Sequence, residues 1–331
     1  MEKFLGRVSP ILHLTRVTTA FAAVSNVWFV ILWSVYTEQE SRTRALADRP
    51  VWLLLLGGAA SALGLYSYGA CLNDILDVRR DRALRPERPL ATGSISSETA
   101  SIAVAVTLIL AVLGAAVFGI NSVLLTLALA VGILFFNAAA RFIPGVGLVV
   151  LGLIYAGHML VPNPGMRFLW PVWLVMSHSL LVAAATHIIA RKVPPLSSRA
   201  TFLAAAGWFV WSVLIIWAGW TRSGGVDEGI RGVWPAWVPL SAALGPALLC
   251  LAFITLAVRR TTQFGIGPRA ADKVYRYGSL WLTLYAAAWM LGAGRVEEAL
   301  ILGIFAAAGF FTMTTLRELY GLAEQPVGYR R

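Results

Sequence analysis

Three aspartates with a helical spacing follow an apolar stretch in the first quarter of the sequence. Asp74, Asp77 and Asp81 occupy positions i, i+3 and i+7, so a helix through this segment would place all three carboxylates on one face. Carboxylates on one stripe repel each other unless a cation lies among them. Oxygen donors of this kind suit Mg²⁺, which keeps several waters and binds substrate phosphates through a few carboxylates. The spacing therefore makes these three residues candidate magnesium ligands.

The alternative is an ordinary charged loop beside a membrane, in which the aspartates pair with the neighbouring arginines 79, 80 and 82. Residues at i and i+1 do not face each other on a helix, which weakens this alternative. Ionisable groups at membrane depth are also functional as a rule. Arg88, seven residues after Asp81, would contact phosphates bound at the same metal. The spacing alone leaves both interpretations open.

The elements that must position these residues are membrane helices. Of the 331 residues, 58% are hydrophobic and 13% are charged, whereas soluble domains are about 45–50% apolar and about 25% charged. This composition excludes a soluble enzyme, a disordered chain and a secreted disulfide scaffold. The two cysteines, Cys71 and Cys250, form neither a disulfide framework nor a metal pattern.

Ten apolar windows divide the chain. They lie near residues 17–35, 51–72, 100–119, 122–140, 143–161, 168–190, 202–220, 236–258, 278–294 and 297–315. With ten spans, 20 of the 27 basic residues fall on the side of both termini and of the loops after spans two, four, six and eight. The positive-inside rule then predicts that this side is cytoplasmic. The sequence predicts an all-α polytopic bundle of about ten (nine to ten) transmembrane helices.

The net charge of +11 has a topological explanation as well. No basic run with interleaved aromatic residues is present, so a nucleic-acid partner is not expected. In a membrane chain, excess lysine and arginine reflect topology and contact with anionic membrane lipids. We expect an integral protein of a prokaryotic plasma membrane, with both termini and the aspartate segment in the cytoplasm.

The aspartate segment resembles the first aspartate-rich motif of the UbiA superfamily of intramembrane prenyltransferases. The specific match covers about residues 66–97, and the hydropathy layout matches over nearly the whole chain. The pattern that carries the resemblance is Asn73-Asp74-x-x-Asp77-x-x-x-Asp81, followed by Arg88-Pro89-Leu90-x-x-Gly93-x-Ile95-Ser96. The start of the first span, from Leu14-Thr15-Arg16 through Asn26, also resembles the family's opening helix, which carries a polar residue facing the cavity.

This resemblance implies a single domain, residues 1–331, with helices around a central lipid-facing cavity and a cytoplasmic motif loop at 72–99. It implies a prenyl diphosphate as substrate, Mg²⁺ as cofactor and transfer of the prenyl group to an aromatic or other lipophilic acceptor. Mg²⁺ and cationic side chains would neutralise the leaving diphosphate, and an apolar cavity would keep water from the allylic cation. The three aspartates would be the catalytic metal ligands. Substrate contacts are expected from Asn73, Arg88, Arg141 and Asn26.

The sequence departs from the family pattern where a second acidic motif belongs, in the loop at 186–200. No Asp or Glu occurs between Glu98 and Asp227. His187 and Arg191 show the i, i+4 spacing that two aspartates would have. One interpretation is that His187, Arg191 and Lys192 hold the diphosphate as cations. The other is that Arg191 and Lys192 are topological residues at a helix end and that His187 is an ordinary interfacial histidine.

Two further hypotheses come from other functional classes. The first is a catalytically inactive or altered UbiA-like protein that binds or handles isoprenoid lipids with half of the usual site. The second is a membrane transporter, although the spans lack the paired interrupted helices of inverted repeats. Magnesium-dependent release of diphosphate would separate the enzyme from the binding protein.

Overall fold

The computed structural model describes residues 14, 20–86 and 88–324, and all regular secondary structure in this part of the chain is helical. Ten long helices correspond one by one to the ten predicted spans. They are α2 (Phe21–Tyr36), α4 (Val51–Leu84), α6 (Ser97–Ala116), α7 (Ile120–Ala138), α8 (Pro144–Met159), α9 (Trp170–Ile189), α10 (Ser198–Arg222), α12 (Leu244–Phe264), α13 (Pro268–Gly292) and α14 (Val296–Glu324). The predicted all-α membrane bundle is thereby confirmed.

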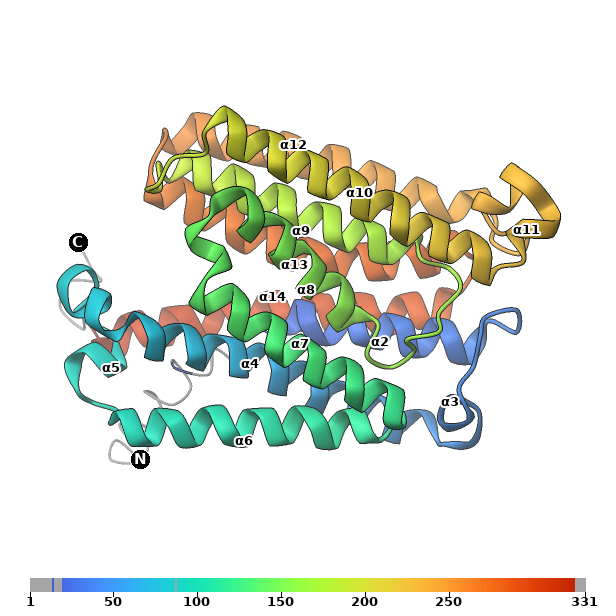
Figure 1. Ribbon diagram of the computed structural model, residues 1–331, viewed down its shortest axis with the longest axis horizontal. Helices are drawn as coiled ribbons and strands as arrows, with labels where there is room; N and C mark the ends of the chain where they lie inside the picture. The colour runs from blue at the N-terminus through green and yellow to red at the C-terminus, as the bar shows by residue number, and fades with distance from the viewer. Residues whose placement is uncertain (1–13, 15–19, 87, 325–331) are drawn as a thin grey trace.

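Short helices connect the long ones. They are α3 (Arg44–Asp48), α5 (Pro89–Thr92), η2 (Ala140–Phe142), α11 (Gly225–Glu228), η3 (Gly229–Val233) and η4 (Leu240–Ala243). The long helices run roughly along the length of the molecule, with α5 at one end and α3 and α11 at the other (Figure 1). The α4–α5 connection, the turn at η2 and the α9–α10 connection therefore meet at one end, as the alternation of spans predicts.

Six of the described helical segments are long and apolar enough to cross a membrane. These are α4, α6, α7 with η2, α9, α10, and η4 with α12, while α2 and α8 are shorter apolar helices. Large apolar side chains on α10 and α12, such as Phe209, Trp217 and Leu248, are exposed. Such a surface would be costly in water but is the expected one against lipid tails.

Helix α4 carries the aspartates, and α6 packs tightly along it. A Cβ placed on Gly64 would lie 2.5 Å from the backbone nitrogen of Ala111, and one on Gly114 would lie 2.4 Å from the backbone nitrogen of Ser61. Glycine is required at both positions because the two backbones approach too closely for any side chain. Helix α4 also packs against α2 and α7. These contacts fix the rotation of α4 and hence the direction in which its polar face points.

The segment predicted as a motif loop, 72–99, is mostly helical. Helix α4 continues past the apolar window to Leu84, so the aspartates lie on its last turns, as the i, i+3, i+7 spacing requires. The chain then turns, forms α5 and enters α6, where the Ser96 side chain accepts a hydrogen bond from the Thr99 amide. Likewise α9 extends to Ile189 and α10 starts at Ser198, which leaves a connection of only 190–197 within the predicted second loop.

Candidate functional site

A cavity of about 600 Å³ opens between α4, α7, α8 and α9, within the size range of small-molecule sites. Its inner walls are apolar and aromatic. The side chains there include Leu65, Ile133, Phe136, Leu148, Leu151 and Ile154. Its mouth lies at the end of α4 and is lined by charged and polar groups. These include Asn73, Asp77, Arg80, Asp81, Arg85, Arg141, His187 and Lys192.

Asp77 forms a two-point ion pair with Arg141 across the mouth. Its Oδ1 accepts a hydrogen bond of 2.6 Å from Nη2 of Arg141, and its Oδ2 accepts one of 2.9 Å from Nη1. The same Nη1 donates to Oδ1 of Asn73 at 2.6 Å. Helix α7 ends at Ala138, and η2 then turns the chain so that Arg141 reaches α4. Both partners of the ion pair have side chains only 15% exposed, which strengthens the interaction.

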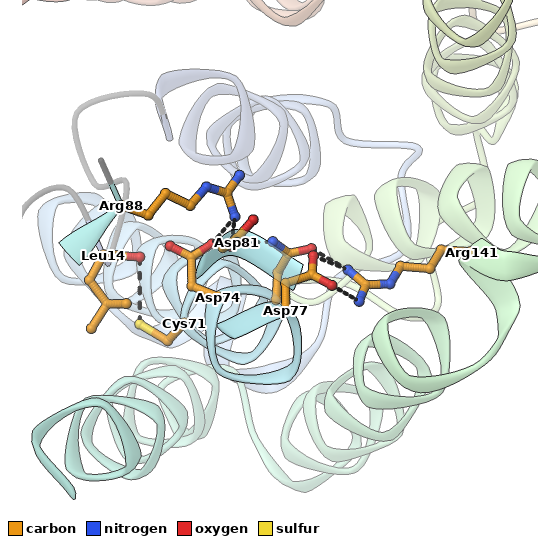
Figure 2. A network of polar contacts seen from close by, with 8 residues as sticks. Leu14, Cys71, Asp74, Asp77, Asp81, Arg88 and Arg141 are labelled. Atoms are coloured by element: carbon orange, nitrogen blue, oxygen red, sulfur yellow. Dashed lines mark hydrogen bonds and ion pairs between the residues drawn. The ribbon is translucent and has the colours of Figure 1, made fainter. Parts of the chain in front are cut away.

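Arg88 binds the other two aspartates from the opposite side (Figure 2). Its Nη1 donates to Oδ1 of Asp74 at 3.1 Å and to Oδ2 of Asp81 at 2.7 Å. Asn73 also donates to Asp74, at 3.2 Å from its Nδ2. Among the described residues, none of the three aspartates forms an ion pair with the neighbouring arginines 79, 80 and 82. The simple loop pairing is therefore not what holds these carboxylates.

The structure divides the predicted site residues into two groups. Six of them line the cavity, namely Asn73, Asp77, Asp81, Arg141, His187 and Lys192. Four do not. Asp74 and Arg88 are outside the lining, where Arg88 donates to both Asp74 and Asp81, and Asn26 is buried on α2, also outside the lining. Arg191 and the adjacent Lys192 are both exposed, but only Lys192 is part of the lining.

The separation of Arg191 from Lys192 has a local cause. After α9 ends, Arg191 adopts a left-handed conformation, with φ of 50°, and so reverses the direction of the chain. The Nε2 atom of His187 hydrogen-bonds to the Pro194 carbonyl at 2.9 Å and closes this turn. Partial desolvation of the charged form lowers the pKa of the Lys192 ammonium group, and repulsion from Arg85 and Arg80 lowers it further.

Several lining residues were missed by the sequence analysis. Arg80 and Arg85 lie at the mouth, and Tyr66, Tyr155 and Tyr275 lie further in. The two arginines could have been found, because Arg80 is three residues after Asp77 and Arg85 is four after Asp81, which are same-face spacings. The tyrosines come from α4, α8 and α13. No sequence signal brings these three helices together.

His158, on α8, also lines the cavity. His158 is only 8% exposed, and its Nε2 has no hydrogen-bond partner among the described residues. Fourteen residues separate it from Pro144 at the mouth, which corresponds to about 21 Å along a helix. It therefore marks the inner end of the cavity rather than the charged mouth.

The oxygen donors at the mouth fit one magnesium ion. Asn73, Asp77 and Asp81 present oxygens to the cavity from successive turns of α4. Mg²⁺ typically takes one or two carboxylates and completes its shell with water and substrate phosphates. Among the described residues, no group of three or more His, Cys, Asp or Glu side chains is arranged to hold a metal. The mouth thus fits a magnesium ion that arrives with phosphates, and the 186–195 segment adds no acid for a second one.

Comparison with solved structures places this fold among known membrane proteins. The structure is similar to that of a digeranylgeranylglyceryl phosphate synthase studied in membranes, with 17% identity, a TM-score of 0.54, and coverage of 90% of this chain and 100% of that chain. A UbiA homologue from Archaeoglobus fulgidus gives 16% identity and a TM-score of 0.48 over 92% of this chain and 99% of that one. A UbiA homologue from the same organism, bound to GPP and Mg²⁺, gives 14% identity and a TM-score of 0.44 over 92% of this chain and 99% of that one.

Only the first of these structures has a TM-score above 0.5, and this chain shares its all-helical fold over 90% of its length. Neither a scan against protein-family models nor a search of curated proteins found a match to the sequence.

Proposed function

We propose that this protein is a UbiA-like membrane prenyltransferase. It would transfer a prenyl group from a prenyl diphosphate to a lipophilic acceptor, aromatic or other, and release diphosphate. The observation that carries the proposal is a single cavity that joins a charged mouth, containing the aspartate motif, to an apolar interior. That arrangement matches a substrate with a charged head and an apolar tail. The fold shared with a membrane synthase supports it.

The mouth has the groups needed to bind and activate a diphosphate. Asn73, Asp77 and Asp81 would hold Mg²⁺, which when bound neutralises charge on the leaving diphosphate. Arg141 is held at the mouth by Asp77 and Asn73 and is in place to donate to phosphate oxygens. Arg88 orients Asp81 through its ion pair and so acts as a positioning residue.

The interior suits an allylic cation and the groups that react with it. Apolar walls exclude water, which would otherwise capture the cation as an alcohol. The rings of Tyr66, Tyr155 and Tyr275 line this part of the cavity, and aromatic faces attract cations. The acceptor and the prenyl tail would share this apolar space.

The basic residues gathered at the mouth also support the orientation. We infer that the mouth faces the cytoplasm, where prenyl diphosphates are soluble, and that membrane lipids surround α10 and α12. A cysteine introduced at the exposed Arg82 should react with an impermeant thiol reagent only from the cytoplasmic side of cells or vesicles. Labelling from the outside would reverse the topology.

The test is diphosphate release by the detergent-purified protein, supplied with geranyl diphosphate and candidate acceptors, with and without Mg²⁺. Release that requires Mg²⁺, exceeds a no-enzyme control and is lost in Asp77→Asn would support the enzyme. Asp272→Asn is the matched control, because Asp272 is an exposed acid on α13 that pairs with Arg276 and is not part of the cavity lining. Equal loss in both variants would contradict the assignment of Asp77.

A second function is favoured by the arginine pairing of the aspartates. Each carboxylate of the motif already accepts hydrogen bonds from Arg88 or Arg141, and the facing segment supplies no acid. A protein that binds isoprenoid diphosphates without turnover would have such a site. Tight binding of geranyl diphosphate with no release across a panel of phenolic and alcoholic acceptors would favour this function over the enzyme.

A further inference from the structure

Three cations line the mouth of the cavity without a carboxylate partner among the described residues. They are Arg80 and Arg85 at the end of α4 and Lys192 in the α9–α10 connection. The carboxylates that share the mouth, Asp77 and Asp81, are engaged by Arg141 and Arg88 instead. The mouth therefore carries a local excess of positive charge that comes from two different segments of the chain.

These cations act on each other. Partial removal of water from around its ammonium group lowers the pKa of Lys192, and repulsion from Arg85 and Arg80 lowers it further. Holding like charges together without a counterion is unfavourable, and a bound anion relieves the repulsion. An ordinary solvated basic surface has no such convergence on a cavity.

We propose that Arg80, Arg85 and Lys192 form a metal-independent site for the terminal phosphate of a bound prenyl diphosphate. The inference rests on the proposed function for the identity of the substrate. The single magnesium ion that the aspartates fit would engage the phosphates from the side of Asn73, Asp77 and Asp81. The three cations take the remaining charge on the terminal phosphate, in a place where no acid is available to hold a second metal.

The residue types fit this division of labour. An arginine fork donates two parallel hydrogen bonds to phosphate oxygens, and a lysine ammonium supplies a compact point charge. A prenyl monophosphate lacks the terminal phosphate and would not reach this site. The ratio of affinities for geranyl diphosphate and geranyl monophosphate therefore measures the site itself, separately from contacts to the prenyl tail.

The experiment compares two double variants of the full-length protein in detergent, by calorimetry in EDTA and again in Mg²⁺. Arg85→Ala with Lys192→Ala removes two members of the site. Arg79→Ala with Arg199→Ala removes the same charge from neighbouring exposed positions outside the cavity lining. Thermal unfolding of each variant checks the fold, and Arg85→Lys with Lys192→Arg tests whether charge alone restores binding.

We expect wild-type protein to prefer geranyl diphosphate over the monophosphate in EDTA. The cavity double variant should lose about tenfold or more of its diphosphate affinity, because each charge-assisted hydrogen bond contributes strongly, with monophosphate affinity nearly unchanged. The control double variant should keep the preference, and the charge-retaining variant should restore most of it. Inorganic diphosphate should compete for the site.

Several results would overturn the proposal. If the wild-type preference for geranyl diphosphate over the monophosphate vanishes in EDTA, the metal ion alone binds the terminal phosphate. Equal losses in both double variants would mean a general surface charge effect. Displacement of geranyl diphosphate by phosphatidylglycerol micelles, but not by inorganic diphosphate, would assign the cations to a lipid headgroup. If the cavity double variant binds geranyl diphosphate normally and Mg²⁺-dependent prenyl transfer persists, this site alone is refuted. If the preference for the diphosphate is intact but no acceptor is prenylated, the proposed function alone is refuted.

Discussion

Buried carboxylates occur at both ends of the bundle and are treated in different ways. Near α3, Glu40 is 4% exposed and accepts four hydrogen bonds, from the Trp33 indole and from the backbone amides of Ser41, Arg167 and Phe168. Burial raises the pKa of its carboxyl, and these hydrogen bonds offset part of the increase. Its donors are all neutral, and they tie the loop after α2 to the start of α9.

At the other end the carboxylates are held by arginines. Asp74 and Asp81 bind Arg88, and Asp77 binds Arg141 beside the cavity. Neutral donors fully used within the protein are typical of a structural role. Charged partners at the edge of a cavity can be exchanged for a metal ion or a phosphate. Burial alone therefore does not identify a functional acid. A functional acid is identified by a charged hydrogen-bond partner and by a face of the carboxylate that opens to a cavity.

The largest effect is expected from removing Arg88. Arg88→Ala would leave Asp74 and Asp81 buried without their shared counter-charge, and should lower the free energy of unfolding by about 3 kcal/mol. Arg82 is exposed and lies on α4, the helix that carries the acids. Arg82→Ala should change the free energy of unfolding by less than about 0.5 kcal/mol. Thermal unfolding in detergent checks both variants. Equal stability of the two would show that the acids at this end do not depend on ionic partners.

Asp77→Asn is expected to separate activity from stability. The amide keeps the shape but retains one acceptor for Arg141 instead of two, so the free energy of unfolding should fall by about 1 kcal/mol, less than for Arg88→Ala. Prenyl transfer should fall on the order of 100-fold, because the charge that organises the metal is lost. Steady-state assays at saturating Mg²⁺ measure this. A loss of stability without a loss of transfer would place Asp77 with Glu40 as a structural acid.

Glu40→Ala is expected to show the opposite pattern. Four donors would lose their acceptor in a buried place, which should cost about 2 kcal/mol of unfolding free energy. The affinity for geranyl diphosphate should be unchanged, since Glu40 is not part of the cavity lining and precedes α3, which lies at the opposite end of the molecule from α5 (Figure 1). A change in affinity larger than about twofold would indicate that the two ends are coupled.

The smallest effect is expected from single substitutions of the cations near the cavity mouth. Lys192→Ala should weaken diphosphate binding by about tenfold, and Arg191→Ala by much less, because only Lys192 lines the cavity. Arg191 and Lys192 carry the same charge. If both only set the membrane topology, the two substitutions should have equal effects on diphosphate binding, and if Lys192 contacts the diphosphate in the cavity, the effects should differ. Titration calorimetry of both variants decides between them.

The lowered pKa of Lys192 adds a dependence on pH. Arg80 and Arg85 from α4 and His187 from α9 are the other charged or titratable groups of the mouth near it, together with the paired Asp77, Asp81 and Arg141. A bound phosphate raises the pKa of the ammonium group again. Affinity is therefore full below the pKa of the free protein and falls as pH rises through it, at a pH lower than the ordinary 10.5 of lysine. Lys192→Arg should remove this loss, since arginine stays protonated.

The sequence by itself determined the periodic features. Apolar windows give ten helices because membrane spans require continuous apolar runs. The spacing of the aspartates gives one helical face, and α4 confirms it by continuing to Leu84. The hydropathy windows ended too early at this end, since they report only the apolar part of a helix that extends into the polar region. The same limit hid the start of α13, which begins at Pro268.

Only the tertiary structure decided which side chains meet. Arg141 pairs with Asp77 across 64 positions of the sequence, and Arg88 rather than a helix neighbour of the acids holds Asp74 and Asp81. Lys192 enters the cavity lining and Arg191 does not, because one left-handed residue reverses the chain. Periodicity is local and can be read from the spacing of residues, whereas contacts between helices depend on how each helix is rotated about its axis. The rotation of α4 is set by its close packing with α6, where Gly64 and Gly114 each face the backbone of the other helix.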